Sequence, residues 1–286
     1  MKIALGTAQF GLEYGVANTA GRVPQNTVKV MLDLARVLSV DTLDTAAAYG
    51  TSEEVLGRLG VDAFKVISKV PPMADYVEKP VSWIKRCVDQ SLNNLGCDSL
   101  YGLLLHRPLD LLRPNGKELY NALLDLKRQG IIQKIGISVY GPHDLDKLAD
   151  YSFDLVQAPM NILDRRLKNS GWLERLSKQG TEVHIRSAFL QGLLLMPEAQ
   201  RPEYFSPWRN LLFEYDAWVT SQNLTPLQAC LGYLNLHPEI DKIVVGVDSV
   251  EQLKEILSAT IAPAISVPTC IQTTELELIN PAKWVL

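Results

Sequence analysis

The sequence predicts an α/β fold, a single (β/α)8 barrel in which eight parallel strands alternate with helices. Short apolar runs alternate with longer amphipathic stretches along all 286 residues, and eight such runs can be counted. One barrel of this kind commonly needs about 250 residues. No Gly-, Ser- or Pro-rich linker divides the chain. We therefore expect residues 1–286 to form one domain, with a C-terminal tail at about 262–286 near the barrel mouth.

Each predicted strand is a short run that is apolar or rich in β-branched residues. Such runs are typical of strands that are buried on both faces of a parallel sheet. In chain order they are Ile3–Gly6, Val40–Leu43, Val66–Ser68, Leu100–Leu105, Lys134–Ile137, Leu155–Gln157, Glu182–Ile185 and Lys242–Val245.

Helix signals lie between the runs. Thr51 and Glu54 have the spacing of a capping box ahead of a helix at Glu53–Leu59, and Ser249 and Gln252 repeat that spacing after the last strand. Apolar spacing, glycine stops and a first-turn proline predict further helices at Ser82–Leu95, Lys117–Arg128, Leu173–Lys178 and Leu227–Asn235.

Composition and charge exclude several classes of protein. Hydrophobic residues make up 47% of the chain and charged residues 21%, so it can bury a sizeable core. The net charge of −4 argues against a nucleic-acid partner, which would favour a basic face. We expect no membrane span, because no apolar run reaches about 18 residues, and no signal peptide at the start MKIALGTAQFG. Four sparse cysteines without a C-x-x-C pair, and four histidines without ligand spacing, predict a cytoplasmic protein with reduced thiols and no metal.

Four polar residues stand at or just after three of the predicted strands. Asp44 ends the second run and Tyr49 follows it, Lys69 ends the third, and His106 ends the fourth. In a barrel of this kind the chemistry lies at the carboxyl ends of the strands, so these side chains can converge above one mouth. Together they offer a tyrosine acid, a lysine cation that can shift the pKa of this acid, an aspartate counter-ion for the lysine, and an imidazole that can orient a substrate.

The segments that carry these residues resemble the aldo-keto reductase superfamily. The similarity lies in DTAAAYG followed by SEEVLG, then ISKV and YGLLLHRP, and it continues through SLNNLG, KIGIS, VQAPMN, SAFLQGLLL and IVVG. It covers roughly residues 3 to 260 and implies a TIM barrel. The family's N-terminal hairpin is expected to be missing, because the chain enters its first strand at once.

The resemblance implies an enzyme that reduces an aldehyde or ketone with hydride from NAD(P)H. Tyr49 would be the general acid, and Lys69 would lower its pKa from an ordinary value near 10. Asp44 would hold Lys69 in place, and His106 would orient the carbonyl by a hydrogen bond. The residues implied to bind the cofactor are Gly6, Thr7, Ser138, Gln157, Arg186, Ser187, Gly246, Asp248, Ser249 and Gln252.

Three positions depart from the family pattern. Val139 stands where an asparagine is usual, and Arg186 stands where the family usually stacks an aromatic ring on the nicotinamide. Arg186 could also meet an anionic substrate group or a diphosphate, or pair with a loop carboxylate. Asp248 stands where many members place a basic residue for the adenosine 2′-phosphate, which favours NADH.

Two other function classes stay open. One is a catalytically weak barrel that binds the cofactor as a sensor or regulatory subunit. The other is an unrelated barrel enzyme that uses Lys69 as a Schiff-base amine. The long segment Gln191–Pro207 is expected to cover the cofactor. Gln157 and Asn161 could form a hydrogen-bonded pair that closes a loop. Phe10 and Trp284 are expected to form aromatic walls for a small carbonyl substrate. The oligomeric state is not predicted.

Overall fold

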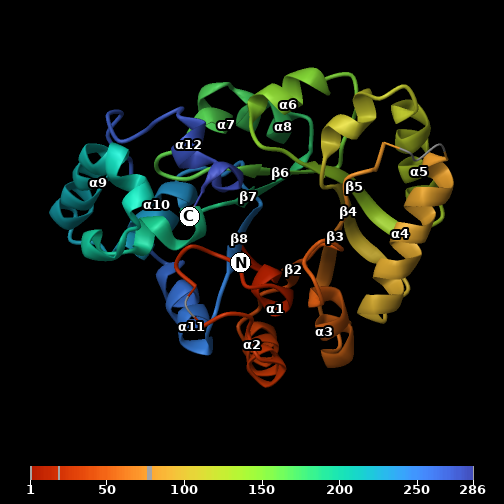
Figure 1. The fold of residues 1–286 in the computed structure, drawn as a ribbon, viewed down its shortest axis with the longest axis horizontal. Coiled ribbons are helices and arrows are strands. Elements are labelled where there is room, and N and C mark those ends of the chain that lie inside the picture. Colours follow the sequence, from red (N-terminus) through yellow and green to blue (C-terminus); the bar gives the residue numbers. More distant parts are fainter. Residues whose placement is uncertain (1, 19, 76–78, 286) are drawn as a thin grey trace.

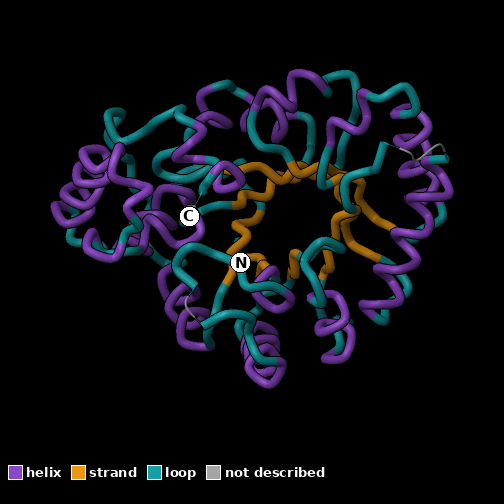
Figure 2. Tube along the Cα trace, in the orientation of Figure 1, coloured by secondary structure: helices purple, strands orange, loops and turns teal. Residues whose placement is uncertain are grey.

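Eight parallel strands close into one barrel in the order β1 to β8. The computed structural model describes residues 2–18, 20–75 and 79–285. Figure 1 shows the helices outside the strands, and Figure 2 shows the strands as a closed ring inside them. This confirms the predicted α/β barrel architecture.

The strands match the predicted runs to within a few residues at their ends. Their bounds are β1 Ile3–Gly6, β2 Thr42–Asp44, β3 Lys65–Val70, β4 Leu100–Leu105, β5 Ile132–Ser138, β6 Leu155–Pro159, β7 Glu182–Arg186 and β8 Lys242–Gly246. Each pairs in parallel with its two neighbours, and β1 pairs with β8 to close the ring.

The helices pack outside this ring and supply most of the apolar side chains that cover it. They are α1 Ala8–Gly11, α2 Gln25–Val37, α3 Ser52–Leu59, α4 Pro80–Leu95, α5 Gly116–Arg128, α6 Pro142–Lys147, α7 Arg166–Asn169, α8 Trp172–Lys178, α9 Arg209–Ser221, α10 Pro226–Asn235, α11 Val250–Ala259 and α12 Leu276–Ile279. The patterns above did not predict α1, α2, α6, α7, α9 or α12. None of the described helices is long and apolar enough to cross a bilayer.

One predicted helix cap is wrong. Thr51 precedes α3 with a ψ of 13°, and its side chain makes no capping hydrogen bond. A side-chain cap needs an extended backbone, which this residue lacks. A full capping box does occur at Thr225 and Gln228, before α10, where each side chain bonds the backbone of the other residue.

Alternation along the strands sorts side chains between the barrel interior and the helix layer. On β7 the residues Glu182, His184 and Arg186 share one face, because successive side chains point to opposite sides of a strand. Val183 and Ile185, on the other face, join the main apolar core. One strand therefore carries polar groups at the floor, the middle and the mouth of the barrel.

Charged side chains gather at the amino-terminal end of the barrel, which we call the floor. Glu182 accepts hydrogen bonds from Tyr101 (2.7 Å) and pairs with Lys134 (2.8 Å). Asp41, just before β2, pairs with Lys242 at the start of β8. These contacts join strands that are not neighbours, so they tie the floor together across the ring.

The C-terminal tail is fastened to the loop that follows β6. The buried Arg165 guanidinium donates to the carbonyl oxygens of Val267 (3.2 Å), Pro268 (3.0 Å) and Ile271 (2.8 Å). It also donates to Ile162 (2.8 Å), beside its own position. A single side chain thus satisfies several tail carbonyls and fixes where residues 267–271 run.

Candidate functional site

The structure brings the four expected catalytic residues together at the carboxyl ends of β2, β3 and β4. Asp44 is the last residue of β2, Lys69 lies in β3, and His106 directly follows β4. Tyr49 lies in the turn between β2 and α3. The parallel register places Asp44 opposite Ile67, two residues before Lys69, so the side chains of Asp44 and Lys69 lie on one face of the sheet.

Lys69 is the centre of this group. Its ammonium contacts Oδ1 of Asp44 at 2.6 Å, the carbonyl oxygen of Thr45 at 2.9 Å and the hydroxyl of Tyr49 at 3.4 Å. An ammonium has three N–H donors, so these contacts use all of them. The Lys69 side chain is 0% exposed and that of Asp44 is 4% exposed. A buried pair of this kind fixes geometry rather than adding net stability.

The pKa of Lys69 lies above its ordinary value of 10.5. Burial acts to lower that pKa, because it penalises the charged form. The negative charge of Asp44 and the contact with Tyr49 act in the opposite direction and prevail. Lys69 therefore stays an ammonium at neutral pH.

Tyr49 does not follow the expected direction. Burial raises the pKa of its hydroxyl above 10, and the neighbouring Lys69 lowers it by less than burial raises it. The expectation of a net lowering is thus wrong, because desolvation of the phenolate outweighs the nearby cation. Tyr49 accordingly holds its proton at neutral pH, as a proton donor must.

His106 lies beside Tyr49 with its ring nearly perpendicular. The ring centroids are 5.9 Å apart and the planes meet at 83°. Burial lowers the pKa of His106 to about 4, and the charge of Lys69 adds to this effect. The imidazole is therefore neutral at neutral pH, with one N–H donor and one acceptor.

A chain of hydrogen bonds connects this group to β5 and β6. Ser138 donates from its hydroxyl to Oε1 of Gln157 (3.3 Å), and Gln157 donates from Nε2 to Oδ2 of Asp44 (2.7 Å). Val139, which replaces the usual asparagine, is buried and accepts a hydrogen bond from Arg186 through its carbonyl oxygen (2.9 Å). Gln157 and Ser138 thus support Asp44 in addition to any contact with a ligand.

A cleft of about 440 Å³ runs from Asp44 and Tyr49 along the ends of β1, β7 and β8 to the start of α11. Most of the residues expected to bind the cofactor line it, namely Gly6, Thr7, Gln157, Arg186, Ser187, Gly246, Asp248 and Gln252. Ser138 and Ser249 are not part of this lining. Ser249 instead caps α11 by accepting from the backbone of Gln252 (3.1 Å).

The end of the cleft at α11 is acidic. Oδ1 of Asp248 is buried and has no hydrogen-bond partner among the described residues, and burial raises the pKa of this carboxyl. Gln252 accepts from the backbone N–H of Asp248 (2.8 Å) rather than from Ser249, so the expected capping box here is only half formed. Glu255 also lines this end.

Arg186 is held by neutral groups. Its guanidinium donates to the Val139 carbonyl (2.9 Å) and the Ser187 hydroxyl (3.3 Å), and it lies 4.9 Å from the centre of the Tyr140 ring. No carboxylate among the described residues lies within ion-pair distance. Within residues 2–18, 20–75 and 79–285, the alternative of a loop carboxylate partner for Arg186 is therefore not borne out.

The structure adds one residue that the sequence patterns missed. The Gln9 side chain lies against Gly246, where a Cβ would collide with it, and Gln9 lines the cleft. Gln9 follows β1 closely, so the same rule of strand ends could have found it. Tyr14 also lines the cleft and accepts a hydrogen bond from Gln191 (3.2 Å).

The segment 191–207 is not a plain loop. It contains short 3-10 turns at Leu190–Leu195, Glu198–Gln200 and Glu203–Trp208. Leu190 and Gln191 have φ angles of 46° and 53°, a strained backbone for residues other than glycine, directly beside the cleft. Part of the segment lines the cleft, including Gln191, Gly192 and Gln200.

Several other expectations are corrected. Phe10 is fully buried in the core, because it lies in α1 and faces inward, so it forms no substrate wall. Trp284 packs edge-to-face on Phe205, with ring centroids 4.9 Å apart. Asn161 does not pair with Gln157. It accepts from the backbone of Asp164 (2.9 Å) and donates to Ser187 (3.0 Å), which closes the loop after β6.

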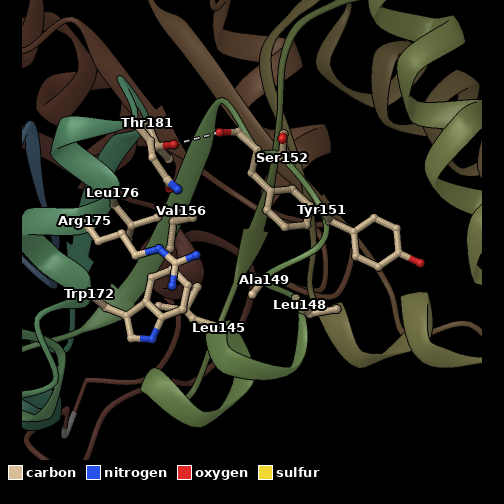
Figure 3. A pocket seen from close by; sticks show the side chains of 12 residues that line it. Leu145, Leu148, Ala149, Tyr151, Ser152, Val156, Trp172, Arg175, Leu176 and Thr181 are labelled. Carbon is tan, nitrogen blue, oxygen red and sulfur yellow. Dashed lines mark hydrogen bonds between the residues drawn. The ribbon is translucent and has the colours of Figure 1, made fainter.

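A separate cavity of about 290 Å³ lies outside the barrel, between α6, β6 and α8 (Figure 3). Apolar side chains such as Leu145 and Val156 line it, together with Trp172, whose indole N–H donates to Asp146 (2.8 Å). None of the four clustered polar residues described above contributes to it. The chemistry of the described chain is therefore expected in the cleft at the barrel mouth.

Comparison with known proteins adds independent information. The model of the Aldo/keto reductase family matches residues 2–264. A relative from Bacillus subtilis (strain 168), named "Uncharacterized oxidoreductase YqkF", is 26% identical over 285 residues, and the match covers 90% of each chain.

Solved structures agree on the fold. The aldo-keto reductase AKR11C1 from Bacillus halodurans in its holo form aligns with a TM-score of 0.74 at 21% identity, covering 93% of this chain and 88% of that one. Its apo form aligns with a TM-score of 0.70 at 22% identity, covering 85% and 84%. The family and the fold together support an oxidoreductase, and the chain belongs to the aldo/keto reductase family.

Proposed function

We propose that the protein reduces a small aldehyde or ketone to an alcohol with hydride from a reduced nicotinamide cofactor, and that Tyr49 is the general acid. One observation carries this proposal. The Tyr49 hydroxyl lies in a cleft, 3.4 Å from the ammonium of Lys69, which is itself paired with Asp44.

The residues of the cleft fit a nicotinamide dinucleotide. The unpartnered Oδ1 of Asp248 can accept from a ribose hydroxyl. The start of α11, a helix of 10 residues, presents backbone N–H groups of the kind that bind phosphate. The Gln157 amide, between Asp44 and the cleft, can bind a carboxamide. When bound, the reduced nicotinamide would supply the hydride.

Tyr49 would give its proton to the carbonyl oxygen as that oxygen gains charge. The phenolate that results would be stabilised by Lys69, because a charged donor makes a stronger hydrogen bond than a neutral one. Asp44 keeps Lys69 positively charged, and Gln157 keeps the second oxygen of Asp44 engaged. The proton leaves on the alcohol, and the negative charge left on Tyr49 stays within one hydrogen-bonded group with the Lys69 ammonium that compensates it.

His106 would position the substrate. A neutral imidazole can donate one N–H to the carbonyl oxygen without competing with Tyr49 as an acid. The depressed pKa of His106, about 4, supports this role. Burial keeps solvent away from the Asp44–Lys69 pair, which strengthens the interactions there.

The two alternatives are less well supported. A Schiff-base lysine must lose its proton to act as a nucleophile, whereas Lys69 has a raised pKa and three engaged donors. A sensor that binds cofactor without turnover would not need the contact between Tyr49 and Lys69.

Stopped-flow fluorescence and absorbance can test the proposal with purified protein, NADH or NADPH, and a panel of small aldehydes and ketones. We expect cofactor binding followed by carbonyl-dependent oxidation. Cofactor binding without oxidation by any carbonyl compound would support the sensor. Trapping of a substrate on Lys69 by borohydride would support the Schiff-base enzyme.

A further inference from the structure

One positive charge stands in the cleft without an opposing charge. Arg186 is the only lysine or arginine among the described residues that line the cleft. It contacts the Val139 carbonyl, the Ser187 hydroxyl and the Tyr140 ring, and all of them are neutral. A guanidinium has five N–H donors, and these hydrogen bonds use two of them.

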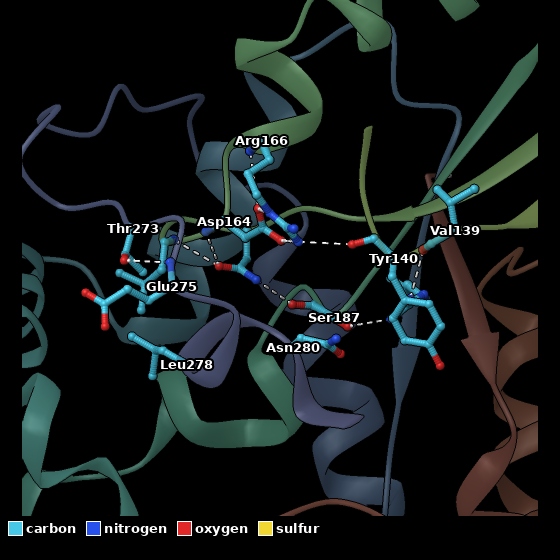
Figure 4. Close-up of polar contacts among 12 residues, drawn as sticks. Val139, Tyr140, Asp164, Arg166, Ser187, Thr273, Glu275, Leu278 and Asn280 are labelled. Atoms are coloured by element: carbon cyan, nitrogen blue, oxygen red, sulfur yellow. Dashed lines mark hydrogen bonds and ion pairs between the residues drawn. The ribbon is translucent and has the colours of Figure 1, made fainter. Parts of the chain in front are cut away.

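The guanidinium is also held in a fixed orientation. Tyr140 covers it on one side, and the Tyr140 carbonyl accepts from Arg166 (3.0 Å), which pairs with the buried Asp164 (2.8 Å). Figure 4 shows Val139 and Tyr140 at the right and Ser187 near the centre, with a dashed line that joins Arg166 to the backbone of Tyr140. A planar fork held in this way is suited to a carboxylate or phosphate, which it can bind through two N–H groups.

The other charged side chains of the cleft give an anionic group of the substrate no second cationic partner. Lys69 is paired with Asp44 and lies beneath Tyr49. The far end carries the acidic side chains of Asp248 and Glu255, and the groups proposed to bind phosphate there are backbone N–H groups of α11. Arg186 and Tyr49 line the same cleft. The cation therefore shares one cavity with the hydroxyl at which a carbonyl would react.

We propose that Arg186 binds an anionic group, a carboxylate or a phosphate, on the carbonyl substrate, and so makes the enzyme selective for anionic aldehydes or ketones. This inference rests on the proposed reductase function. The same chemistry could instead serve the diphosphate of the cofactor, and the experiment below separates the two sources.

The test compares matched carbonyl pairs, 4-oxobutanoate with butanal and glyceraldehyde 3-phosphate with glyceraldehyde. For at least one pair we expect the wild type to favour the anionic member by about 10-fold or more in kcat/KM, as expected for a charged hydrogen bond. Arg186→Gln should reduce that ratio by about 10- to 100-fold, and Arg186→Lys by less, because an ammonium keeps the charge but loses the fork.

Arg22→Gln is the matched control. Arg22 is exposed, donates to the Thr51 hydroxyl (3.3 Å), and does not line the cleft. The Arg22→Gln substitution removes one positive charge from the surface. It should leave the anionic-to-neutral ratio of kcat/KM as in the wild type. Higher salt should reduce the ratio of the wild type, since salt screens charge.

Binding of succinate, measured by calorimetry, gives a readout that needs no turnover. We expect Arg186→Gln to weaken it by about 10-fold or more. The proposal would be overturned if the anionic-to-neutral ratio of kcat/KM were the same in the wild type and in Arg186→Gln for both substrate pairs. It would also be overturned if Arg186→Gln lost affinity for NADH while this ratio stayed unchanged, because that result would assign the guanidinium to the cofactor. If no carbonyl compound is reduced, the reductase function fails, and succinate binding alone decides the role of Arg186.

Discussion

Gln157 donates a hydrogen bond to Asp44 across 2.7 Å, although 113 residues separate them in the chain. Because the other oxygen of Asp44 contacts Lys69, both oxygens of the buried carboxylate are engaged. The position of Lys69 beneath Tyr49 therefore depends on side chains from β2, β3 and β6. This shared support leads to several testable expectations.

Tyr49→Phe removes the proposed acid and keeps the ring. We expect the rate of carbonyl reduction to fall by about 10²- to 10⁴-fold, the usual worth of a positioned general acid. Cofactor affinity should change little, because the hydroxyl points to the substrate side. Single-turnover rates are the appropriate measurement, since slow product release can hide the chemical step. A wild-type single-turnover rate would show that Tyr49 is not the acid.

Lys69→Met leaves Asp44 buried without its counter-ion. Removing one partner of a buried pair typically costs about 3–5 kcal/mol, so the free energy of unfolding in urea should fall by that amount. The double variant Lys69→Met with Asp44→Asn removes both charges and should lose less than the sum of the two single losses. A Lys69→Met protein within about 1 kcal/mol of the wild type would contradict a buried, charged Asp44.

His106 should remain neutral well below neutral pH. Its pKa is lowered from 6.5 to about 4, so the unfolded chain binds a proton here between these values while the folded protein does not. The contribution of His106 to stability is thus present above about pH 6.5 and is lost as the pH falls toward 4. NMR titration of the imidazole, assigned with His106→Asn, measures this directly. Titration near 6.5 would refute the desolvated environment.

The floor of the barrel should be acid-sensitive. Tyr101, Lys134 and His184 surround Glu182, and despite burial its pKa is lowered from 4.5 to about 2, while that of Asp41 is likewise lowered to about 2. A carboxyl with a depressed folded pKa stabilises the fold above its unfolded pKa and loses this effect as the pH falls toward the folded value.

Urea unfolding between pH 5 and 2 should therefore show falling stability, with a shallower dependence in Glu182→Gln. Glu118→Gln, at an exposed position of α5, controls for the loss of one negative charge. An identical pH dependence in wild type and Glu182→Gln would show that Glu182 has no stabilising partners at the floor.

The cofactor preference follows from the acidic end of the cleft. Asp248 and Gln252 cannot provide the charged hydrogen bond of about 1.5–3 kcal/mol that a basic residue gives to a phosphate. We expect NADH to bind as well as NADPH or better, as measured by quenching of tryptophan fluorescence at fixed salt. Asp248→Arg should shift the ratio toward NADPH. If NADPH binds the wild type more than about 100-fold tighter, a gap of about 2.7 kcal/mol, then this interpretation of Asp248 is wrong.

Much of the site could be predicted from the sequence because strand geometry is regular. Once the runs are assigned to a parallel barrel, the residues that end them must meet at one rim, and this is where Asp44, Lys69 and His106 lie. The contact of Tyr49 with Lys69 follows because only a short turn separates Tyr49 from β2.

What could not be predicted depends on packing between distant segments. The pKa of Tyr49 is set by the balance between burial and Lys69, and no spacing reveals how deeply a ring is buried. The neutral partners of Arg186 come from another strand end and its own neighbour. Thr51 has the spacing of a cap but the wrong backbone angle, which only the fold determines.

Because side chains alternate along β7, the contacts at the barrel floor and the cation in the cleft both depend on the register of this one strand. Glu182, His184 and Arg186 share one face, and Val183 and Ile185 share the other. Deleting one residue just before β7 would turn every side chain of the strand to the opposite face. The floor contacts and the cleft cation would then be lost in one step, and two apolar side chains would enter the barrel. Tolerance to insertions and deletions in this strand should therefore be far lower than tolerance to substitutions at any one of its positions.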